Sequence, residues 1–499
     1  MMAKEIQKKP GPKMILPGSK EWARPEETPE GRKIAGKLDS ERSIDSALTA
    51  PAPVEYPRNS HYVNRAGPDA EIHAPPLRTA LEMVDERAVG AEWLRKVSEG
   101  IIPSLEKEKG EPIQTLSGNP HADRALFMLS PAGGHVFARA IGSKTKGYSS
   151  NILHGRRDTG DGIVWDEKPL FTDGISREDP RASLINGRIY FTYARIDGKD
   201  SEDPDVGLAV IEDPSRPDKV REMGTIMRIR EDGVDGKDAA VFQGDGKVHV
   251  LVRLKPGIQV VSFKDMSELE DTLCRDPAKR DAFWKDMRAS YLKDPWKYNH
   301  LHDNTPGMGE WRPKWRAQFR AKAKELVNKY GESDLYRIDL DSKYWFGTGN
   351  PPLKVEHKGG KYWLGFHHWG QVLGDLTEDG RKEMKRQGRR EESLKMYGVL
   401  ATLHDYKDLT KIVAVSPTPI STPDLETETL RGKTMDRHPL SHRDAVPFVK
   451  IVSGAAIDGT GDDRKVNLYV GVNDVYTIPE KIRLGKLMDW MLEYGRYNP

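Results

Sequence analysis

A hairpin pattern that returns five times constrains the fold of this chain more than any other feature. Each copy has an apolar strand, a turn built on Gly or a short polar pair, and an alternating strand that ends on a charged or polar residue; the copies lie at 125–140, 182–195, 239–253, 352–368 and 446–474. Self-similar hairpins with a period of about 50 residues are a signature of the β-propeller. We therefore predict an all-β fold, a five-bladed β-propeller with a helical N-terminal extension and helical insertions.

The ends of the second strands are the first candidates for a functional site. In a propeller the equivalent strand end of every blade faces one central funnel, so polar residues far apart in the sequence are expected to meet there. In the five copies these residues are Arg139, Tyr193 or Arg195, Arg253, His367 and Asp474.

The composition limits the partners that this chain can have. The 499 residues include 79 basic and 77 acidic residues, a net charge of +2, so no global field favours nucleic acid or an anionic membrane. The single cysteine, Cys274, excludes an intramolecular disulfide and a Cys-based zinc cluster. Without an apolar run long enough for a signal peptide or a bilayer span, we expect a soluble cytoplasmic protein, and we leave a homo-oligomer open.

Patterning divides the chain into a propeller and its additions. Hydrophobic residues make up only 36% and the mean hydropathy is -0.69, which favours long solvated insertions and a disordered tail. Residues 266–341 and 371–395 are predicted to be helical insertions, and 422–444 a loop. The predicted parts are a tail at 1–75, a helical extension at 76–117, the propeller at 118–480 and a C-terminal helix at 481–499.

The string Arg177-Glu178-Asp179-Pro180-Arg181 opens the second copy and carries two adjacent carboxylates. Because successive side chains on a regular strand point to opposite faces, we expect one carboxylate to face the funnel and the other to pair with the scaffold. Pro180 suits a strand start or an irregular edge. Taken alone, the string is better explained by a surface loop with an Asp-Pro turn and local Arg pairing.

Cationic residues gather at the corresponding places of the third and fourth copies. Asp238 precedes an apolar run, and Arg253 closes the same hairpin, where a guanidinium needs an anionic partner. Lys354 and His367 lie on the two strands of the fourth hairpin. Converging cations favour a phosphate or carboxylate ligand, whereas Asp474 is suited to accept hydrogen bonds from sugar hydroxyls.

Other chemistries have little support in the sequence. There is no P-loop, HExxH or GxSxG string. The pair His367-His368 has no carboxylate at ligand spacing, so no metal site is predicted.

The motifs, in their order along the chain, resemble glycoside hydrolase family 130, the β-mannoside phosphorylases and related β-mannosidases. The resemblance runs from about Gly118 to Tyr476 and consists of the strings GNP, FAR, DGIVWDEKPLF, EDPR, KDAAVF with LVR, GTGNPPLK with FHH, YGVLATLHDYKDLTKI and LYVGVND. The string FHHWG departs from the family, which usually reads like YHG at this place.

The resemblance implies an inverting phosphorylase that cleaves β-mannosides to α-mannose 1-phosphate, with inorganic phosphate as co-substrate and no cofactor. Asp179 matches the general acid, which is thought to act through a hydroxyl of the bound mannose. It also implies a phosphate subsite and a mannose subsite. The matching residues are Arg253, Lys354 and His367 for phosphate, and Arg139, Arg181, Asp238 and Asp474 for mannose.

Two alternatives stay open beside the phosphorylase. An inverting β-mannosidase would need a carboxylate base for water, for which Glu356 and Asp238 are candidates. A non-catalytic carbohydrate-binding propeller would not require an acid at Asp179. An arabinanase or fructosidase is disfavoured, because the strands from Leu126 to Arg139 contain no Asp or Glu.

Overall fold

The computed structural model describes most of the chain from the first helix onward. All described residues belong to the unit Arg58–Pro499. The predicted tail at 1–75 and most of the predicted loop at 422–444 lie outside them. The described residues are 86–144, 149–158, 162–196, 204–228, 238–254, 257–294, 297–301, 308–330, 335–340, 344–386, 393–424 and 448–496.

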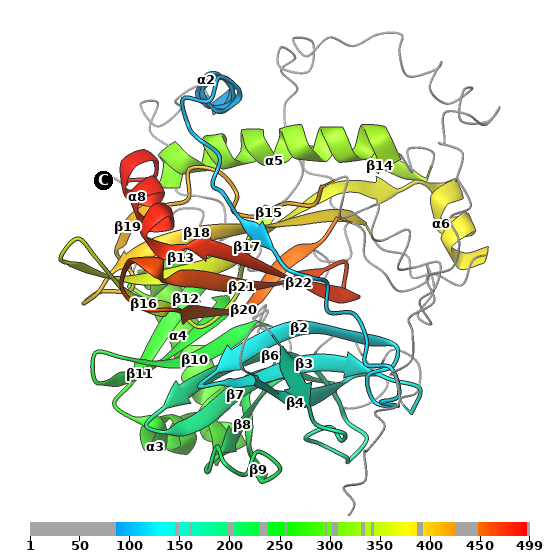
Figure 1. The fold of residues 1–499 in the computed structure, drawn as a ribbon, viewed down its shortest axis with the longest axis vertical. Coiled ribbons are helices and arrows are strands. Elements are labelled where there is room, and N and C mark those ends of the chain that lie inside the picture. Colours follow the sequence, from blue (N-terminus) through cyan, green and yellow to red (C-terminus); the bar gives the residue numbers. More distant parts are fainter. Residues whose placement is uncertain are drawn as a thin grey trace, which may run out of the picture. The chain divides into compact units, whose positions relative to one another are not determined.

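Five antiparallel sheets form the blades of a β-propeller, as the recurring hairpins predict (Figure 1). Consecutive strands are neighbours in each of the first three blades. Blade one comprises β2 (Ala125–Ala132), β3 (His135–Ile141), β4 (Asn151–Arg157) and β5 (Ile163–Trp165). Blade two comprises β6 (Ser176–Ile185), β7 (Arg188–Ile196), β8 (Asp205–Ile211) and β9 (Val220–Met227). Blade three comprises β10 (Ala239–Gly244), β11 (Lys247–Leu254), β12 (Gly257–Phe263) and β13 (Asn299–Leu301).

Blade four is the most elaborate sheet. One edge of the 17-residue strand β17 (Gly360–Leu376) pairs with three short strands, β14 (Tyr336–Ile338), β15 (Tyr344–Thr348) and β16 (Leu353–His357). On its other edge lie β18 (Leu394–Asp405) and then β19 (Ile412–Val415). The predicted helical insertion at 371–395 therefore begins as strand, and its helix is the shorter α6 (Glu378–Arg386).

Blade five joins the two ends of the described chain. It contains β20 (Lys450–Asp458), β21 (Lys465–Val472) and β22 (Tyr476–Arg483), and its outer strand is β1 (Glu108–Lys109). β1 pairs antiparallel with β22, with Lys109 opposite Glu480. The propeller thus begins before the predicted boundary at residue 118, because a two-residue strand carries no alternating pattern.

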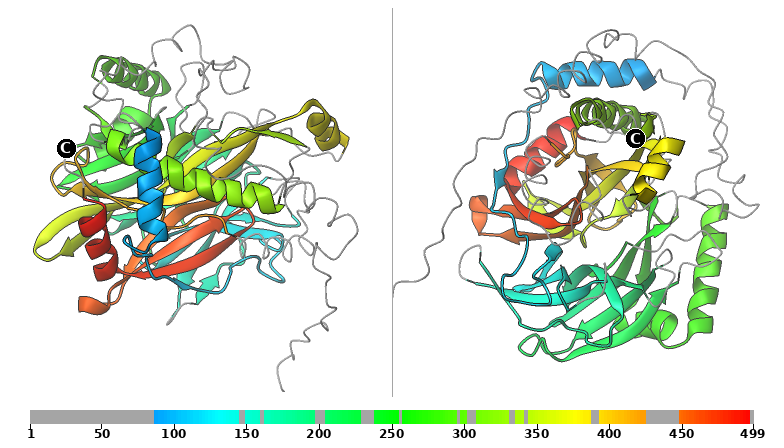
Figure 2. Two further views of the ribbon diagram at one scale, coloured as in Figure 1. Left: turned by 90° about the horizontal axis from the view of Figure 1, so that it is seen from above. Right: turned by 90° about the vertical axis from the view of Figure 1, so that its right-hand side faces the viewer.

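Helices from the insertions cover several blades: Trp284 of one helix donates to the Ile226 carbonyl in blade two, and another helix covers blade four. The insertion at 266–341 contains α3 (Met266–Leu269), a π-helical turn η4 (Glu270–Cys274), α4 (Pro277–Lys293), β13 and α5 (Met308–Tyr330). On α5, Phe319 stacks on Trp369 of β17 with ring centroids 5.2 Å apart. Trp93 of α2 (Glu86–Ser98) meets Trp311 edge-on at 5.4 Å, so α2 lies on α5 (Figure 2). A short helix, α8 (Leu484–Tyr494), follows β22.

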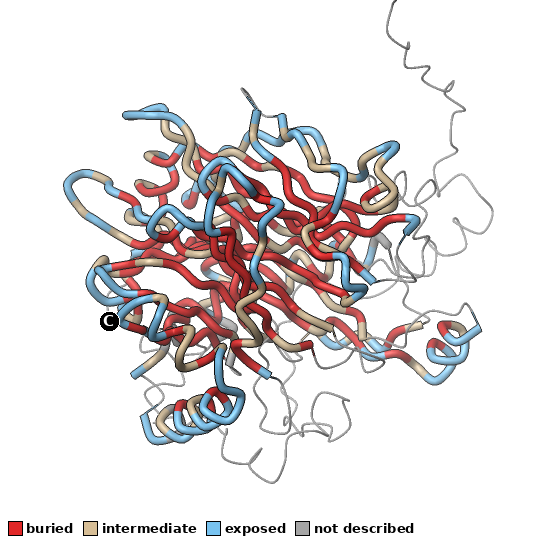
Figure 3. The backbone as a smooth tube through the Cα atoms, turned by 90° about the horizontal axis from the view of Figure 1, so that it is seen from below, coloured by how far each residue is buried: buried red, intermediate tan, exposed pale blue. Residues whose placement is uncertain are grey.

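The inner strands are buried on both faces (Figure 3). All seven residues of β3 are buried, and so are nine of the ten in β6. A strand enclosed by neighbouring sheets on both sides is apolar throughout, which explains the run Ala125–Leu129. Charged side chains in such strands therefore need partners inside the fold.

Candidate active site

The polar strand ends of blades one to four meet in one buried group, which we call the strand-end cluster. Its members come from β3, β6, β11, β17 and the residue that precedes β10. They are Arg139, Glu178, Asp179, Arg181, Asp238, Arg253 and His368.

A bulge in β6 places Asp179 in the cluster. The register of β6 against β7 shifts between Glu178 and Arg181, and Asp179 has a φ of 53°, in the left-handed region. Met128 has a φ of 55° at the matching register shift in β2. A bulge redirects side chains and ends the simple alternation of faces.

This bulge overturns the expectation that only one of the two carboxylates faces the funnel. Glu178 Oε1 lies 2.5 Å from Nη2 of Arg139, and Asp179 Oδ1 lies 3.2 Å from Nη1 of the same guanidinium. Both carboxylates thus point to one cation. In the sequence, the string Asp179-Pro180 indicates such a bulge, because Asp tolerates a positive φ and Pro cannot donate a hydrogen bond to the neighbouring strand.

Arg139 is held in place from two other sides. Its Nε donates to Ser150 Oγ at 3.2 Å, and its guanidinium lies over the ring of Phe127, 5.0 Å from the centroid. Ser150 Oγ donates in turn to the carbonyl of Arg177, one residue before Glu178. The guanidinium is therefore oriented before any ligand binds.

Arg181 connects the bulge to blade four. Its Nη1 donates to the Asp179 carbonyl at 3.0 Å, and its Nε donates to the carbonyl of Gly349 at 2.7 Å. Nη2 donates to Asp238 Oδ1 at 2.8 Å and to the Thr348 carbonyl at 3.1 Å. With 1% of its side chain exposed, Arg181 links blade two to blade four through these hydrogen bonds.

Asp238 is the second carboxylate centre of the cluster. Its Oδ1 accepts from Arg181, and its Oδ2 lies 3.1 Å from Nη1 of Arg253. His368 Nε2 is 3.6 Å from the same Oδ2. Burial lowers the pKa of His368 to about 4, so this ring is neutral at physiological pH.

A glycine makes room for His368. A Cβ on Gly347, the residue opposite on β15, would stand 1.8 Å from His368 Nε2. The ring therefore occupies the space that any other residue at 347 would fill. His368 was not among the predicted site residues.

Two of the predicted residues, His367 and Lys354, have other surroundings in the structure. His367 points to the opposite face of β17, where its Nε2 is 2.8 Å from Thr402 Oγ1. Lys354 is exposed on β16 and lies over the ring of Trp363, 5.2 Å from the centroid. Asp474 lies half-buried in the turn between β21 and β22, with a φ of 55°. The structure brings together Arg139, Asp179, Arg181, Asp238 and Arg253, and it places His367 and Lys354 elsewhere.

The charges that pair in the cluster balance one another. Three guanidiniums, of Arg139, Arg181 and Arg253, face three carboxylates, of Glu178, Asp179 and Asp238, within the described residues. A balanced, buried group is suited to bind a neutral polar ligand by hydrogen bonds, such as a sugar.

Cys274, the one thiol, plays no part in this group. It ends the π-helical turn η4, and burial raises its pKa to about 12. A thiol with such a pKa is protonated and poorly nucleophilic.

The chain shows similarity to solved structures at low sequence identity. A β-1,2-mannobiose phosphorylase from Listeria innocua is 16% identical, with 78% of this chain and 99% of that chain covered and a TM-score of 0.44. MPT-1, a GDP-Man-dependent mannosyltransferase from Leishmania mexicana, is 13% identical over 79% and 95% of the two chains, with a TM-score of 0.44. MPT-4, a mannose phosphorylase from the same organism, is 14% identical over 80% and 95%, with a TM-score of 0.42. Similarity at this level leaves the activity of the present chain undecided.

Comparison of the sequence with protein families and with curated proteins found no match. Among the described helices, none combines the length and the apolar character needed to cross a bilayer.

Proposed function

We propose that the strand-end cluster is the active site of an inverting glycoside phosphorylase, which cleaves β-mannosides with inorganic phosphate to give α-mannose 1-phosphate. The observation that carries this proposal is the bulge at Asp179. A non-glycine residue with positive φ in the middle of a buried strand costs free energy, and such strain is typical of functional sites. The resemblance of the motifs to the β-mannoside phosphorylases supplies the substrate class.

In this reaction Asp179 is the general acid. Its proton passes, through a hydroxyl of the bound mannose, to the glycosidic oxygen as the bond from that oxygen to C1 breaks. A phosphate oxygen attacks C1 from the opposite face and forms the new bond, so the configuration inverts. In inverting hydrolases the carboxyl groups of the acid and the base lie about 6.5–9.5 Å apart. Phosphate already carries a nucleophilic oxygen, so the phosphorylase reaction needs no carboxylate base. Arg139, shared between Glu178 and Asp179, positions the acid.

Hydrolysis by an inverting β-mannosidase is the second candidate, and the charge balance favours it. Arg253 is the one predicted phosphate ligand in the strand-end cluster, where it pairs with Asp238. Of the two carboxylates considered as a base for water, Glu356 is exposed on β16 and pairs with Lys361, whereas Asp238 lies in the cluster. Asp238 is therefore the base that a hydrolytic reaction would use.

Product analysis separates these functions. The full-length protein is incubated with a panel of β-mannosides, with and without inorganic phosphate, and the products are resolved by chromatography. Phosphate-dependent α-mannose 1-phosphate supports the phosphorylase, whereas free mannose formed equally without phosphate contradicts it and supports the mannosidase. Binding of mannosides without any turnover contradicts both and supports a carbohydrate-binding propeller.

The Asp179→Asn variant tests the acid itself. Loss of a general acid lowers the rate by about 10²–10⁴-fold, so we expect kcat to fall by at least two orders of magnitude with the fold intact by circular dichroism. Asp245→Asn is the matched control, because Asp245 also has a positive φ, of 49°, but lies in the turn between β10 and β11. Unchanged turnover in Asp179→Asn would show that the acid is a different residue.

A further inference from the structure

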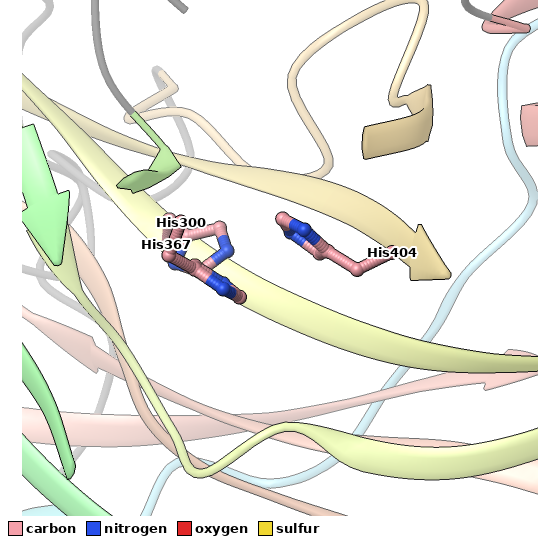
Figure 4. A group of neighbouring side chains, drawn as sticks. All are labelled: His300, His367 and His404. Carbon is pink, nitrogen blue, oxygen red and sulfur yellow. The ribbon is translucent and has the colours of Figure 1, made fainter. Parts of the chain in front are cut away.

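Three buried histidines meet on the other side of β17 from the strand-end cluster. His300 comes from β13, His367 from β17 and His404 from β18, so the group joins the insertion strand of blade three to blade four (Figure 4). All three side chains have no exposed surface. One ring nitrogen from each residue lies within 4.8 Å of the corresponding nitrogens of the other two.

The hydrogen bonding in this histidine group is incomplete. Within the described residues, both nitrogens of His300 and the Nδ1 atoms of His367 and His404 are buried without a hydrogen bond of good geometry, and the backbone of Leu409 is the polar group that interacts with His300 and His404. Buried polar atoms are normally paired, and each one left unsatisfied costs free energy. Four such atoms in one place therefore call for an explanation.

Thr402 orients two of the rings. Its Oγ1 lies 2.8 Å from His367 Nε2 and 2.8 Å from His404 Nε2. A hydroxyl oxygen has two acceptor lone pairs, so both Nε2–H groups can donate to it. In that arrangement both Nδ1 atoms present lone pairs, and metal-binding histidines are commonly fixed through the opposite nitrogen in this manner.

We propose that His300, His367 and His404 form a site for a divalent transition metal of the zinc class. Imidazole nitrogen suits zinc, copper and nickel, and the absence of carboxylate from the three-residue group disfavours magnesium and calcium. The site is separate from the strand-end cluster and does not depend on the proposed function. It would cross-link β13, β17 and β18, so its role is structural.

Metal binding requires a small rearrangement of the rings. A tetrahedral zinc ion with Zn–N bonds of about 2.0–2.1 Å holds its ligand nitrogens about 3.3 Å apart. The rings of His300 and His404 are stacked, with centroids 3.9 Å apart and planes 15° apart, so one of them must rotate to direct its nitrogen at the ion. Side-chain rotation of this size leaves the strands in place.

The test is metal binding by the full-length, tag-free protein after chelation and dialysis. We expect one equivalent of zinc by mass spectrometry of the metal content, and a visible absorption band of tetrahedral Co²⁺ when cobalt alone is added. His300→Gln and His404→Gln should each weaken zinc affinity at least tenfold. His249→Gln is the matched control, because His249 is buried but bonded to Ser262 and Gly244, and it should bind zinc like the wild type.

Metal-binding measurements on the wild-type protein test the proposal even if a variant fails to fold. Zinc uptake well below one equivalent, with no cobalt band and no zinc-dependent rise in melting temperature, would overturn it. So would full zinc uptake by a folded His300→Gln variant. Thr402→Val should weaken zinc binding without abolishing it, because it removes an orienting group and leaves the ligands.

Discussion

At the scale of single residues, the strand-end cluster consists of buried charged side chains that pair with one another. Arg181 is almost fully buried, and its N–H groups donate hydrogen bonds to one carboxylate and three backbone carbonyls. Removing one partner of a buried ion pair is costly because the remaining charge keeps its desolvation penalty. The positions of Asp238 and Arg181 are therefore requirements of stability as well as of function.

Asp238→Asn tests this stability. We expect the free energy of unfolding to fall by about 2–4 kcal/mol, because Arg181 loses its charged partner within the buried cluster. Urea denaturation followed by tryptophan fluorescence measures the change. Glu383→Gln, which removes an exposed pair on α6, should change the free energy by less than about 1 kcal/mol. Equal effects of the two substitutions would contradict the assignment.

The candidate site residues were predictable where the hairpin repeat applied. Arg139 and Arg253 close equivalent strands, and Asp179 and Asp238 precede equivalent strands, whereas Arg181 was predicted from the family resemblance. The alternation rule failed at Glu178 and Asp179 because a bulge interrupts it. His367 and His368 are adjacent, so only the register against β15, which puts Gly347 opposite His368, decides which ring faces the cluster.

At the scale of elements, the closure of blade five depends on one buried carboxylate. Glu480 of β22 has no exposed surface; Lys107 Nζ lies 2.7 Å from its Oε2, and Lys450 Nζ lies 3.7 Å from its Oε1. Ser421 Oγ also donates to Oε1. Lys107, which precedes β1, and Lys450, the first residue of β20, thereby both contact one carboxylate of β22.

Glu480→Gln should weaken this closure. We expect a loss of about 3–5 kcal/mol in unfolding free energy, since Lys107 loses its carboxylate and the buried Lys450 keeps only Asp424 as an anionic partner. Hydrogen exchange at β1 and β22 should accelerate more than exchange at β7. Glu108→Gln, on the neighbouring strand β1, is the control, because its pair with Lys465 is exposed. If exchange rises uniformly, Glu480 does not act on the closure.

Elements differ in how much of them the sequence predicts. The hairpins and α4 carry clear patterns, and Asp276 caps α4 ahead of Pro277 at its first turn. The strands β1, β13 and β14 have two or three residues each and are held by backbone pairing, so no side-chain period marks them. The segment 371–395 is highly charged and is predicted to be helical, yet residues 371–376 pair with β14 and β18 and are strand.

At the scale of the whole molecule, buried neutral histidines make stability depend on pH. His154 is fully buried, with Nδ1 2.7 Å from Asp166 Oδ2 and Nε2 2.9 Å from His135 Nδ1. Burial lowers the pKa values of His135 and His154, and nearby Arg156 lowers them further. Below about pH 6.5 the unfolded chain therefore binds more protons than the folded chain.

The melting temperature should accordingly fall as the pH is lowered from 7 towards 5, and it should be insensitive to these groups above pH 7. Each unit by which a histidine pKa is lowered contributes about 1.4 kcal/mol to this loss. Differential scanning calorimetry at several pH values measures the slope. His154→Gln should reduce the slope, and an unchanged slope would show that His154 does not titrate on unfolding.

Because β1 pairs with β22, it is synthesised long before the strand with which it pairs. Lys107 and Glu480, which meet at this closure, are 373 positions apart. At about 5–20 residues per second, β1 leaves the ribosome roughly 20–75 s before its partner strand exists. Blades one to four therefore form on a chain whose first strand is still unpaired, and an exposed edge of this kind is where a nascent chain is open to chaperones and to aggregation.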